Sequence, residues 1–195
     1  PLIEGRSALD AGASTGGFTD VLLRRGAASV VAVDVGYGQL AWKLQSDPRV
    51  EVHDRTNVRT LDPASVAPAP DIVVGDMSFI SLTLVLPALV AAAAPDADFL
   101  LMVKPQFEIG KERLGHGGVV RNPEHHVETV ENVARCAIGL GLDIAAIAPS
   151  PLPGPSGNVE YFLYMRRDYP EPISPHELTE YIRRAVAEGP AGGAL

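Results

Sequence analysis

Apolar and polar positions alternate along this chain in a pattern that predicts strands and helices in turn. Short apolar runs, rich in valine and alanine, are separated by longer segments in which apolar residues recur every three or four positions. Runs of the first kind are typical of buried strands, and segments of the second kind are typical of amphipathic helices. The predicted strands are 7–10, 29–34, 50–53, 71–74, 99–103, 143–148 and 159–165, and the predicted helices are 17–25, 39–45, 81–94, 122–139 and 174–186.

This alternation predicts an α/β protein with an open, seven-stranded, mostly parallel sheet and helices on both faces. The turn at 150–158 is too short for a helical crossover, so we expect an antiparallel strand near one edge of the sheet. We expect one domain over residues 1–188 and a flexible tail over 189–195. The long loop at 106–121 is predicted to be a lid or a disordered segment.

Two smaller features refine the predicted helices. Asn122, Pro123 and Glu124 form a helix start, with a cap, a proline in the first turn and an acid near the positive end of the helix. Ser174 and Glu177 have the spacing of a capping box, which predicts that the last helix opens there.

Composition and charge exclude several classes of protein. The formal net charge is −8, so the chain as a whole does not have the basic character of a nucleic-acid-binding protein, and any RNA would need a local patch or further protein. One cysteine, Cys136, excludes an internal disulfide and favours a reducing compartment such as the cytoplasm. The apolar run 82–94 is interrupted by Thr83 and Pro87 and is shorter than the roughly 20 residues that span a bilayer. The histidines lack metal-ligand spacing, so we expect neither a membrane segment nor a metal site.

A glycine-rich turn follows the first predicted strand. A dinucleotide site has the pattern G-x-G-x-x-G, whereas here Asp10 precedes the pattern Gly12-x-x-x-Gly16-Gly17. A carboxylate at this point would repel a pyrophosphate, but it suits a ligand that carries an ammonium and a sulfonium. Asp34 ends the second strand, where a carboxylate can accept hydrogen bonds from both hydroxyls of a ribose. These features favour S-adenosylmethionine as the cofactor.

The third predicted strand is followed by Asp54 and Asn57, at the usual level of the adenine. Acids at three consecutive strand ends fit S-adenosylmethionine better than NAD. For Asp54 and Asn57, a role as ordinary turn residues is an equally good interpretation, and the glycine pattern alone could reflect tight packing between strand and helix. We predict a cofactor site that also includes the loop residues Ala13, Ser14 and Thr15.

Three other ionisable residues lie in apolar runs. Asp76 follows the fourth predicted strand, Lys104 follows the fifth, and Glu160 lies in the seventh. Because an unpaired charge in an apolar setting is costly, we expect the three to lie together, either as catalytic residues or as structural ion pairs. A methyl transfer to an alcohol needs a group that accepts the hydroxyl proton. Lys104 could be that base as a neutral amine, or it could position the substrate as a cation, and the sequence leaves both roles open.

These three residues resemble part of the Lys–Asp–Lys–Glu tetrad of FtsJ-like ribose 2′-O-methyltransferases. Longer strings are similar to the TlyA (haemolysin A) family, namely 9–19, 34–40, 55–57, 76–81, 103–107 and 150–161. The resemblance implies a Rossmann-like class I methyltransferase that uses S-adenosylmethionine to methylate cytidine 2′-hydroxyls in the rRNA of ribosomal subunits. It also implies that Arg55 and Asp76 belong to the cofactor site.

The chain departs from that family at its start. The first lysine of the tetrad lies upstream of the glycine loop, and no lysine precedes Lys43 here. The N-terminal RNA-binding domain of the family also has no counterpart. We therefore expect this chain to be the catalytic domain alone, and methylation to require a longer chain.

Other functions stay open at this point. Asp76-Met77-Ser78-Phe79 is faintly similar to the acid-Pro-Pro-aromatic motif of base N-methyltransferases. A membrane-active haemolysin and a cofactor-binding module without activity are further alternatives. Phe79 either stacks on a flipped base or belongs to the core at the start of a helix. The target nucleotide and the oligomeric state are not predicted.

Overall fold

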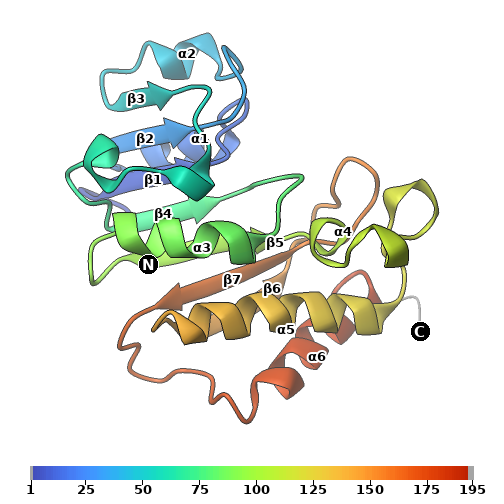
Figure 1. Ribbon diagram of the computed structural model, residues 1–195. Coiled ribbons are helices and arrows are strands. Elements are labelled where there is room, and N and C mark those ends of the chain that lie inside the picture. The colour runs from blue at the N-terminus through green and yellow to red at the C-terminus, as the bar shows by residue number, and fades with distance from the viewer. Residues whose placement is uncertain (1, 193–195) are drawn as a thin grey trace. The chain divides into compact units, whose positions relative to one another are not determined.

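The computed structural model describes residues 2–192, which contain seven β-strands joined into one sheet (Figure 1). The strands are β1 (Ser7–Ala11), β2 (Ser29–Val33), β3 (Val50–His53), β4 (Ile72–Gly75), β5 (Asp98–Val103), β6 (Asp143–Pro149) and β7 (Tyr161–Arg166). Their order is β3-β2-β1-β4-β5-β7-β6. Strands β1 to β5 pair in parallel, and β6 pairs with β7 antiparallel. The predicted sheet, including its antiparallel edge, is confirmed.

Five of the six α-helices in residues 2–192 follow the predicted order with shifted ends, whereas α4 falls largely in the segment that was predicted to be a loop. The six helices are α1 (Gly17–Arg24), α2 (Trp42–Gln45), α3 (Leu82–Ala92), α4 (Pro105–Glu108), α5 (Pro123–Gly139) and α6 (Leu178–Glu188). Contacts divide the chain into two compact units. The first unit consists of residues 1–77 and 84–101, and the second of residues 78–83 and 102–195. Each unit has its own architecture.

The first unit contains β1 to β4 and most of β5. Its strand order reverses between β1, which pairs with β2 on one side, and β4, which pairs with it on the other. Such a switch point is where open α/β sheets bind their ligands, at the carboxyl ends of the strands. Helix α1 packs on the sheet there, with Leu22 buried in one cluster with Ala8 and Val30. The fold of this unit therefore places the loop between β1 and α1 at the expected ligand position.

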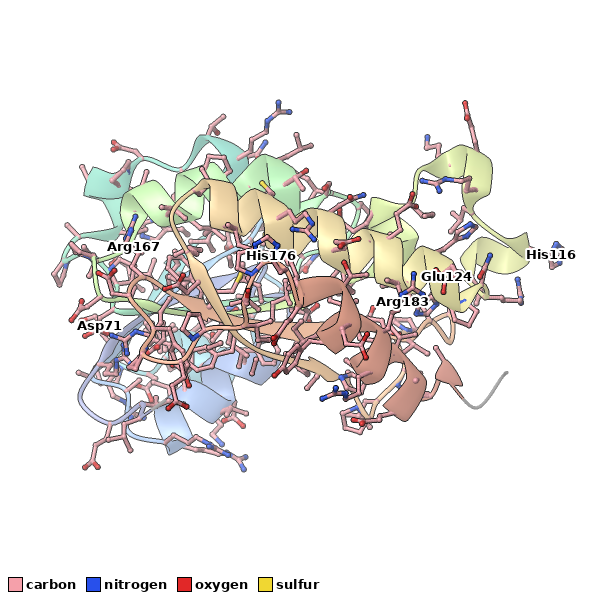
Figure 2. All side chains as sticks on the ribbon, turned by 90° about the horizontal axis from the view of Figure 1, so that it is seen from below. Asp71, His116, Glu124, Arg167, His176 and Arg183 are labelled. Carbon is pink, nitrogen blue, oxygen red and sulfur yellow. The ribbon has the colours of Figure 1, made fainter. Side chains whose placement is uncertain are left out.

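The second unit contains β6, β7, α4, α5 and α6. Helices α5 and α6 pack together, and the Arg183 guanidinium of α6 contacts the Glu124 carboxylate of α5 at 2.5 Å (Figure 2). The predicted cap of α5 is confirmed, because the Asn122 side chain accepts a hydrogen bond from the Glu124 N–H. The antiparallel register of β6 and β7 shifts between Ile144 and Ala146. These elements carry the turn at 150–158 and Glu160, which lies two positions after it.

Several predicted boundaries are wrong for local reasons. The capping box does not form: α6 begins at Leu178, Glu177 makes no side-chain cap bond, and Ser174 Oγ accepts from the His176 N–H in a separate turn. The 106–121 loop is built from α4 and two short 3-10 turns. Glu160 precedes β7 instead of lying within it.

The end of the chain is described as far as residue 192. Ala191 is buried, and the Gly192 N–H donates to the Gly189 carbonyl. Residues 193–195, where the rest of the predicted flexible tail falls, lie outside the described residues. Over residues 2–192, none of the helices has the length and apolar character needed to cross a membrane.

Candidate active site

The loop between β1 and α1 is held by its own backbone. The N–H groups of Gly12 and Ala13 both donate to the Val33 carbonyl at the end of β2, at 2.9 and 3.0 Å. Gly12 has φ +79°, and a Cβ there would lie 2.6 Å from the backbone oxygen of Asp76. Both features require glycine, because a side chain would be strained and would collide with a backbone atom that cannot swing away. Gly12 thus lets the loop approach the end of β4.

Gly16 ends this loop and begins α1. Its φ is +105°, and an added Cβ would collide with the side chains of Leu40 and Leu44. The helix has no side-chain cap, and the next residue, Gly17, is exposed, so that a Cβ added there would meet no heavy atom within 4 Å. The first turn of α1 therefore begins at two glycines, whose own side chains cover none of its backbone N–H groups.

Asp34, the predicted ribose ligand, lies against the same loop. Its Oδ2 accepts from the Ser14 N–H at 2.7 Å, and its Oδ1 accepts from the Gly36 N–H at 2.8 Å. Ser14 has φ +51°, a conformation that this hydrogen bond stabilises. Each carboxylate oxygen has a second acceptor position, so Asp34 can still bind two hydroxyls. The Thr15 carbonyl, farther along the loop, accepts from the Ala41 N–H.

Asp10 lies beneath the loop and is fully buried. Its Oδ2 accepts from Thr19 Oγ1 at 2.7 Å, whereas the buried Oδ1 has no hydrogen-bond partner among the described residues. Burial raises the pKa of Asp10 to about 6; the Thr19 hydrogen bond opposes this, and the charges of Asp76 and Asp34 add to it. The first unit thus concentrates negative charge where a cationic ligand would relieve it.

The residues after β3 have structural partners of their own. Asp54 Oδ2 accepts from the Gly38 N–H at 3.2 Å, and the Arg55 guanidinium lies 4.4 Å from the centroid of the Tyr37 ring. The Asn57 side chain caps the short 3-10 turn that follows it. Each of the three side chains thus has a partner within its own part of the chain. Their contact with a cofactor stays a prediction.

The second unit carries Lys104, which is the N-cap of α4 and only 8% exposed. Its Nζ donates to Ser78 Oγ at 3.1 Å. The helix is a single turn in which the Phe107 N–H donates to the Lys104 carbonyl, which keeps Lys104 rigid at the end of β5. Ser78 is a residue that sequence reasoning did not assign, although it lies two positions after Asp76.

Glu160 is also in the second unit and is 5% exposed. Its Oε2 accepts from Gln106 Nε2 at 2.9 Å, and its carbonyl accepts from the Ser150 N–H at 2.7 Å. A Cβ on Gly154 would lie 2.8 Å from Glu160 Oε2, so the 150–158 turn packs directly on the carboxylate. The sequence indicated Glu160 by its charge, but nothing in the pattern indicated Gln106.

Phe79, in segment 78–83, forms an aromatic pair with Phe107 of α4. Phe79 is 88% exposed, has φ +64°, and its ring centroid lies 4.8 Å from that of Phe107. The interpretation of Phe79 as a core residue is therefore wrong. A bulky residue held exposed in the left-handed region is uncommon and is often found at functional sites.

Glu108 closes the other end of α4. Its carboxylate accepts from Ser81 Oγ at 2.5 Å and from the Leu82 N–H at 2.8 Å, which caps the start of α3. Burial raises the pKa of Glu108, and both hydrogen bonds oppose that rise. Together with Lys104 and Ser78, this contact fastens both ends of segment 78–83 to the single turn of α4.

A buried polar network fastens the segment after α4. His126 Nε2 lies 2.8 Å from the Val120 carbonyl, and its Nδ1 lies 2.7 Å from the Tyr161 hydroxyl. Burial lowers the pKa of His126, so the ring is neutral, with Nε2–H as the donor to Val120 and Nδ1 as the acceptor. The Asn158 side chain accepts a hydrogen bond from the Val120 N–H and donates one to the Gly118 carbonyl. The segment predicted to be a lid is thus anchored at its end.

The structure therefore places the predicted residues in two groups. The cofactor residues and Asp76, whose N–H donates to the Ala11 carbonyl, belong to the first unit, and Lys104 and Glu160 belong to the second. Within residues 2–192, no group of three or more His, Cys, Asp or Glu side chains could hold a metal ion.

Comparisons with known proteins agree with this geometry. The model of the FtsJ-like methyltransferase family matches residues 1–167, so the chain belongs to that family. It is 56% identical over 188 residues to the 16S/23S rRNA (cytidine-2'-O)-methyltransferase TlyA of Mycobacterium tuberculosis, which covers 96% of this chain and 70% of that protein. This identity places the chain with TlyA inside the family, as the resemblance predicted.

Solved structures confirm the fold. A protein structure from Streptococcus thermophilus has a TM-score of 0.88 at 38% identity and covers 96% of this chain and 69% of that one. An S-adenosylmethionine dependent methyltransferase from Mesorhizobium loti has a TM-score of 0.61 at 13% identity over 86% and 93% of the two chains. The Rossmann-like methyltransferase fold is therefore confirmed, and the family confirms both the enzyme class and S-adenosylmethionine as the cofactor.

Proposed function

We propose that this FtsJ-like methyltransferase transfers the methyl group of S-adenosylmethionine to a ribose 2′-hydroxyl of rRNA, with cytidine in ribosomal subunits as the target. The observation that carries the proposal is Lys104, a buried amine at the end of β5. A relative with 56% identity has this reaction in its name, which supports the choice of substrate.

The residues of the first unit fit the cofactor. Gly12 and Gly16 keep the loop free of side chains, Asp34 offers two carboxylate oxygens for the ribose, and the buried acid Asp10 favours a cationic ligand. We propose that these residues hold S-adenosylmethionine, with Asp76 and the loop residues Ala13, Ser14, Thr15 and Gly17 around it and with Asp54, Arg55 and Asn57 near the adenine. The bound cofactor supplies an electrophilic methyl group on a sulfonium.

The residues of the second unit act on the hydroxyl. The 2′-oxygen must lose its proton as its bond to the methyl carbon forms, and general acid–base catalysis of this kind contributes about 10²–10⁴-fold. Lys104 is proposed to accept that proton or to hold the oxygen in place, with Ser78 fixing its Nζ. Glu160 is proposed to bind the reacting ribose, and Asp76 is the third proposed catalytic residue.

The part of RNA recognition that this chain supplies has to come from local features, because the net charge is −8. Phe79, exposed and in tilted contact with the Phe107 ring, offers a ring face on which a splayed-out base can stack. Lys111, Arg121 and His116 lie on the segment after α4, and Figure 2 shows His116 at its outer end. We propose that this segment contacts phosphates.

A methyl-transfer assay on ribosomal subunits tests the proposal. Labelled S-adenosylmethionine is supplied to this chain, to a longer chain that includes the upstream segment of the family, and to Lys104→Ala, Glu160→Ala and Asp76→Ala in the longer chain. The product is mapped by its resistance to alkaline cleavage, which a 2′-O-methyl group confers. We expect label on the ribose for the longer chain and strong loss in each of its variants. Label on a base would support the N-methyltransferase alternative. Cofactor binding without any transfer would support a non-catalytic module.

The two roles of Lys104 are separated by Lys104→Arg. A guanidinium keeps the positive charge but does not accept a proton at neutral pH. Activity near zero in Lys104→Arg would show that the amine is the base, whereas substantial activity would show that the charge positions the substrate.

A further inference from the structure

We propose that Gln106 is a positioning residue, which together with Gly154 fixes the orientation of the Glu160 carboxylate. Its kinetic consequence rests on the proposed function, in which Glu160 acts on the ribose. The glutamine lies in the single turn of α4, two residues after Lys104.

The contacts of the Glu160 carboxylate carry this proposal. Oε2 of the carboxylate accepts a hydrogen bond from Gln106 Nε2 at 2.9 Å. The same oxygen faces Gly154, where an added Cβ would lie only 2.8 Å from it. The backbone on both sides is fixed: the Gly154 N–H donates to the Asn158 carbonyl at 2.9 Å, and the Ser150 N–H donates to the Glu160 carbonyl. The Glu160 carboxylate is therefore confined by packing against Gly154 and oriented by the hydrogen bond from the Gln106 amide.

The orientation of the Gln106 amide follows from chemistry. A carboxylate only accepts hydrogen bonds, so the NH₂ group has to face Glu160. The amide oxygen then points the other way, where Oε1 is buried with no hydrogen-bond partner in the part of the chain that the structure describes. A buried amide oxygen without a donor is unfavourable, and a leucine of similar size would avoid it. The hydrogen bond to Glu160 is therefore the interaction that a glutamine makes at this position and a leucine would not.

The turn that carries Gln106 also carries Lys104. The Phe107 N–H donates to the Lys104 carbonyl and closes the turn, so the backbone of Gln106 is fixed relative to that of Lys104. Lys104 and Glu108 hold segment 78–83 through Ser78 and Ser81, and these contacts do not involve Gln106. Removal of the glutamine amide should therefore release Glu160 and leave the rest of the turn in place.

A double-mutant cycle tests this inference. The variants are Gln106→Leu, Glu160→Ala and both together, and the matched control is Thr129→Val, which removes a buried hydrogen bond of α5 from Thr129 Oγ1 to the His126 carbonyl. Rates are measured on ribosomal subunits, and cofactor affinity is measured by calorimetry. We expect Gln106→Leu to lower kcat about tenfold, less than the roughly 100-fold that a 1 Å misplacement can cost. The KM and the cofactor affinity should change by less than about twofold.

In the Glu160→Ala background, Gln106→Leu should have no further effect, because the residue that it positions is gone. An equal loss of kcat in both backgrounds would overturn the inference, as would full activity of either single variant. Thr129→Val should lower the melting temperature and keep kcat.

A crystallographic readout separates this inference from the proposed function. If the longer chain transfers no methyl group to ribosomal subunits, the proposed function fails, and the structures of the wild type and Gln106→Leu decide the inference alone. We expect Glu160 to adopt another rotamer in Gln106→Leu and to keep its position in Thr129→Val. An unmoved carboxylate in Gln106→Leu would overturn the inference.

Discussion

The two units of this protein hold their functional groups in different ways. In the first unit, the loop after β1 is shaped by backbone, with glycines at positive φ and N–H groups that bind Val33. In the second unit, side chains hold side chains, as in the contacts Lys104–Ser78 and Glu160–Gln106. A backbone-built site fails when a Cβ is added, and a side-chain-built site fails when a single polar atom is removed. Substitutions in the two units should therefore separate binding from chemistry.

Lys104→Met gives the largest expected effect. It removes the amine but keeps most of the buried stem, and it should lower kcat for methyl transfer about 10³-fold, within the range of general acid–base catalysis. The affinity for S-adenosylmethionine should change little, because Lys104 belongs to the second unit. Single-turnover assays and calorimetry on the same preparation check both values. Loss of cofactor binding in this variant would contradict the separation of binding and chemistry.

Gly12→Ala is the corresponding change in the first unit. The new Cβ would lie 2.6 Å from the Asp76 carbonyl oxygen at a residue with φ +79°, so the loop has to move. We expect cofactor affinity to fall about 100-fold, which corresponds to about 2.7 kcal/mol, while the rate at saturating cofactor falls much less. The control is Gly139→Ala, in α5, where a Cβ meets no heavy atom within 4 Å. Unchanged affinity in Gly12→Ala would show that the loop does not hold the cofactor.

Asp10 tests the charge beneath the loop. In the folded state its pKa is raised to about 6, against 3.8 for an ordinary aspartate, with burial as the largest cause. Between these two pH values the folded state binds more protons than the unfolded state, so the free energy of unfolding should fall as the pH rises from about 4 to about 6 and then level off. The expected fall is on the order of 3 kcal/mol.

Asp10→Asn should abolish this part of the pH dependence while keeping a side-chain oxygen that can accept from Thr19. Urea denaturation of both proteins between pH 4 and pH 7 measures the difference. Curves of stability against pH that run parallel for the two proteins would contradict the raised pKa of Asp10.

The same contrast explains how much could be predicted from sequence. Strand β3 and helix α5 matched their predicted ranges closely. Such elements can be predicted because the spacing of apolar residues is visible within a few neighbouring positions. The glycine loop was found for a similar reason, since its glycines and acid lie within a few positions of one another. The capping box at Ser174 failed because Ser174 Oγ accepts from the His176 N–H in a separate turn, and α6 begins only at Leu178.

The candidate catalytic residues were predicted from their charge within apolar runs and from their resemblance to the family's tetrad. Gln106 and Glu160 are 54 positions apart and their pairing leaves no periodic signal, so the neutral partner was missed. Of the two interpretations of Phe79, the core position is wrong for a related reason. Its exposure follows from a left-handed backbone at the end of segment 76–79, which composition does not reveal.

Ser78→Ala gives the smallest expected effect and tests the second unit at the level of one atom. The change removes Oγ, which accepts from Lys104 Nζ at 3.1 Å. Because Lys104 makes further interactions, the amine should stay near its place and kcat should fall only about fivefold, the value of roughly one hydrogen bond. Ser65→Ala is the control, since its hydroxyl donates to the Asp62 carbonyl on the surface of the first unit. A loss as large as that of Lys104→Met would mean that Ser78 itself takes part in the proton transfer. In that case the chemistry of the second unit would depend on a hydroxyl–amine pair, with Lys104 acting through Ser78.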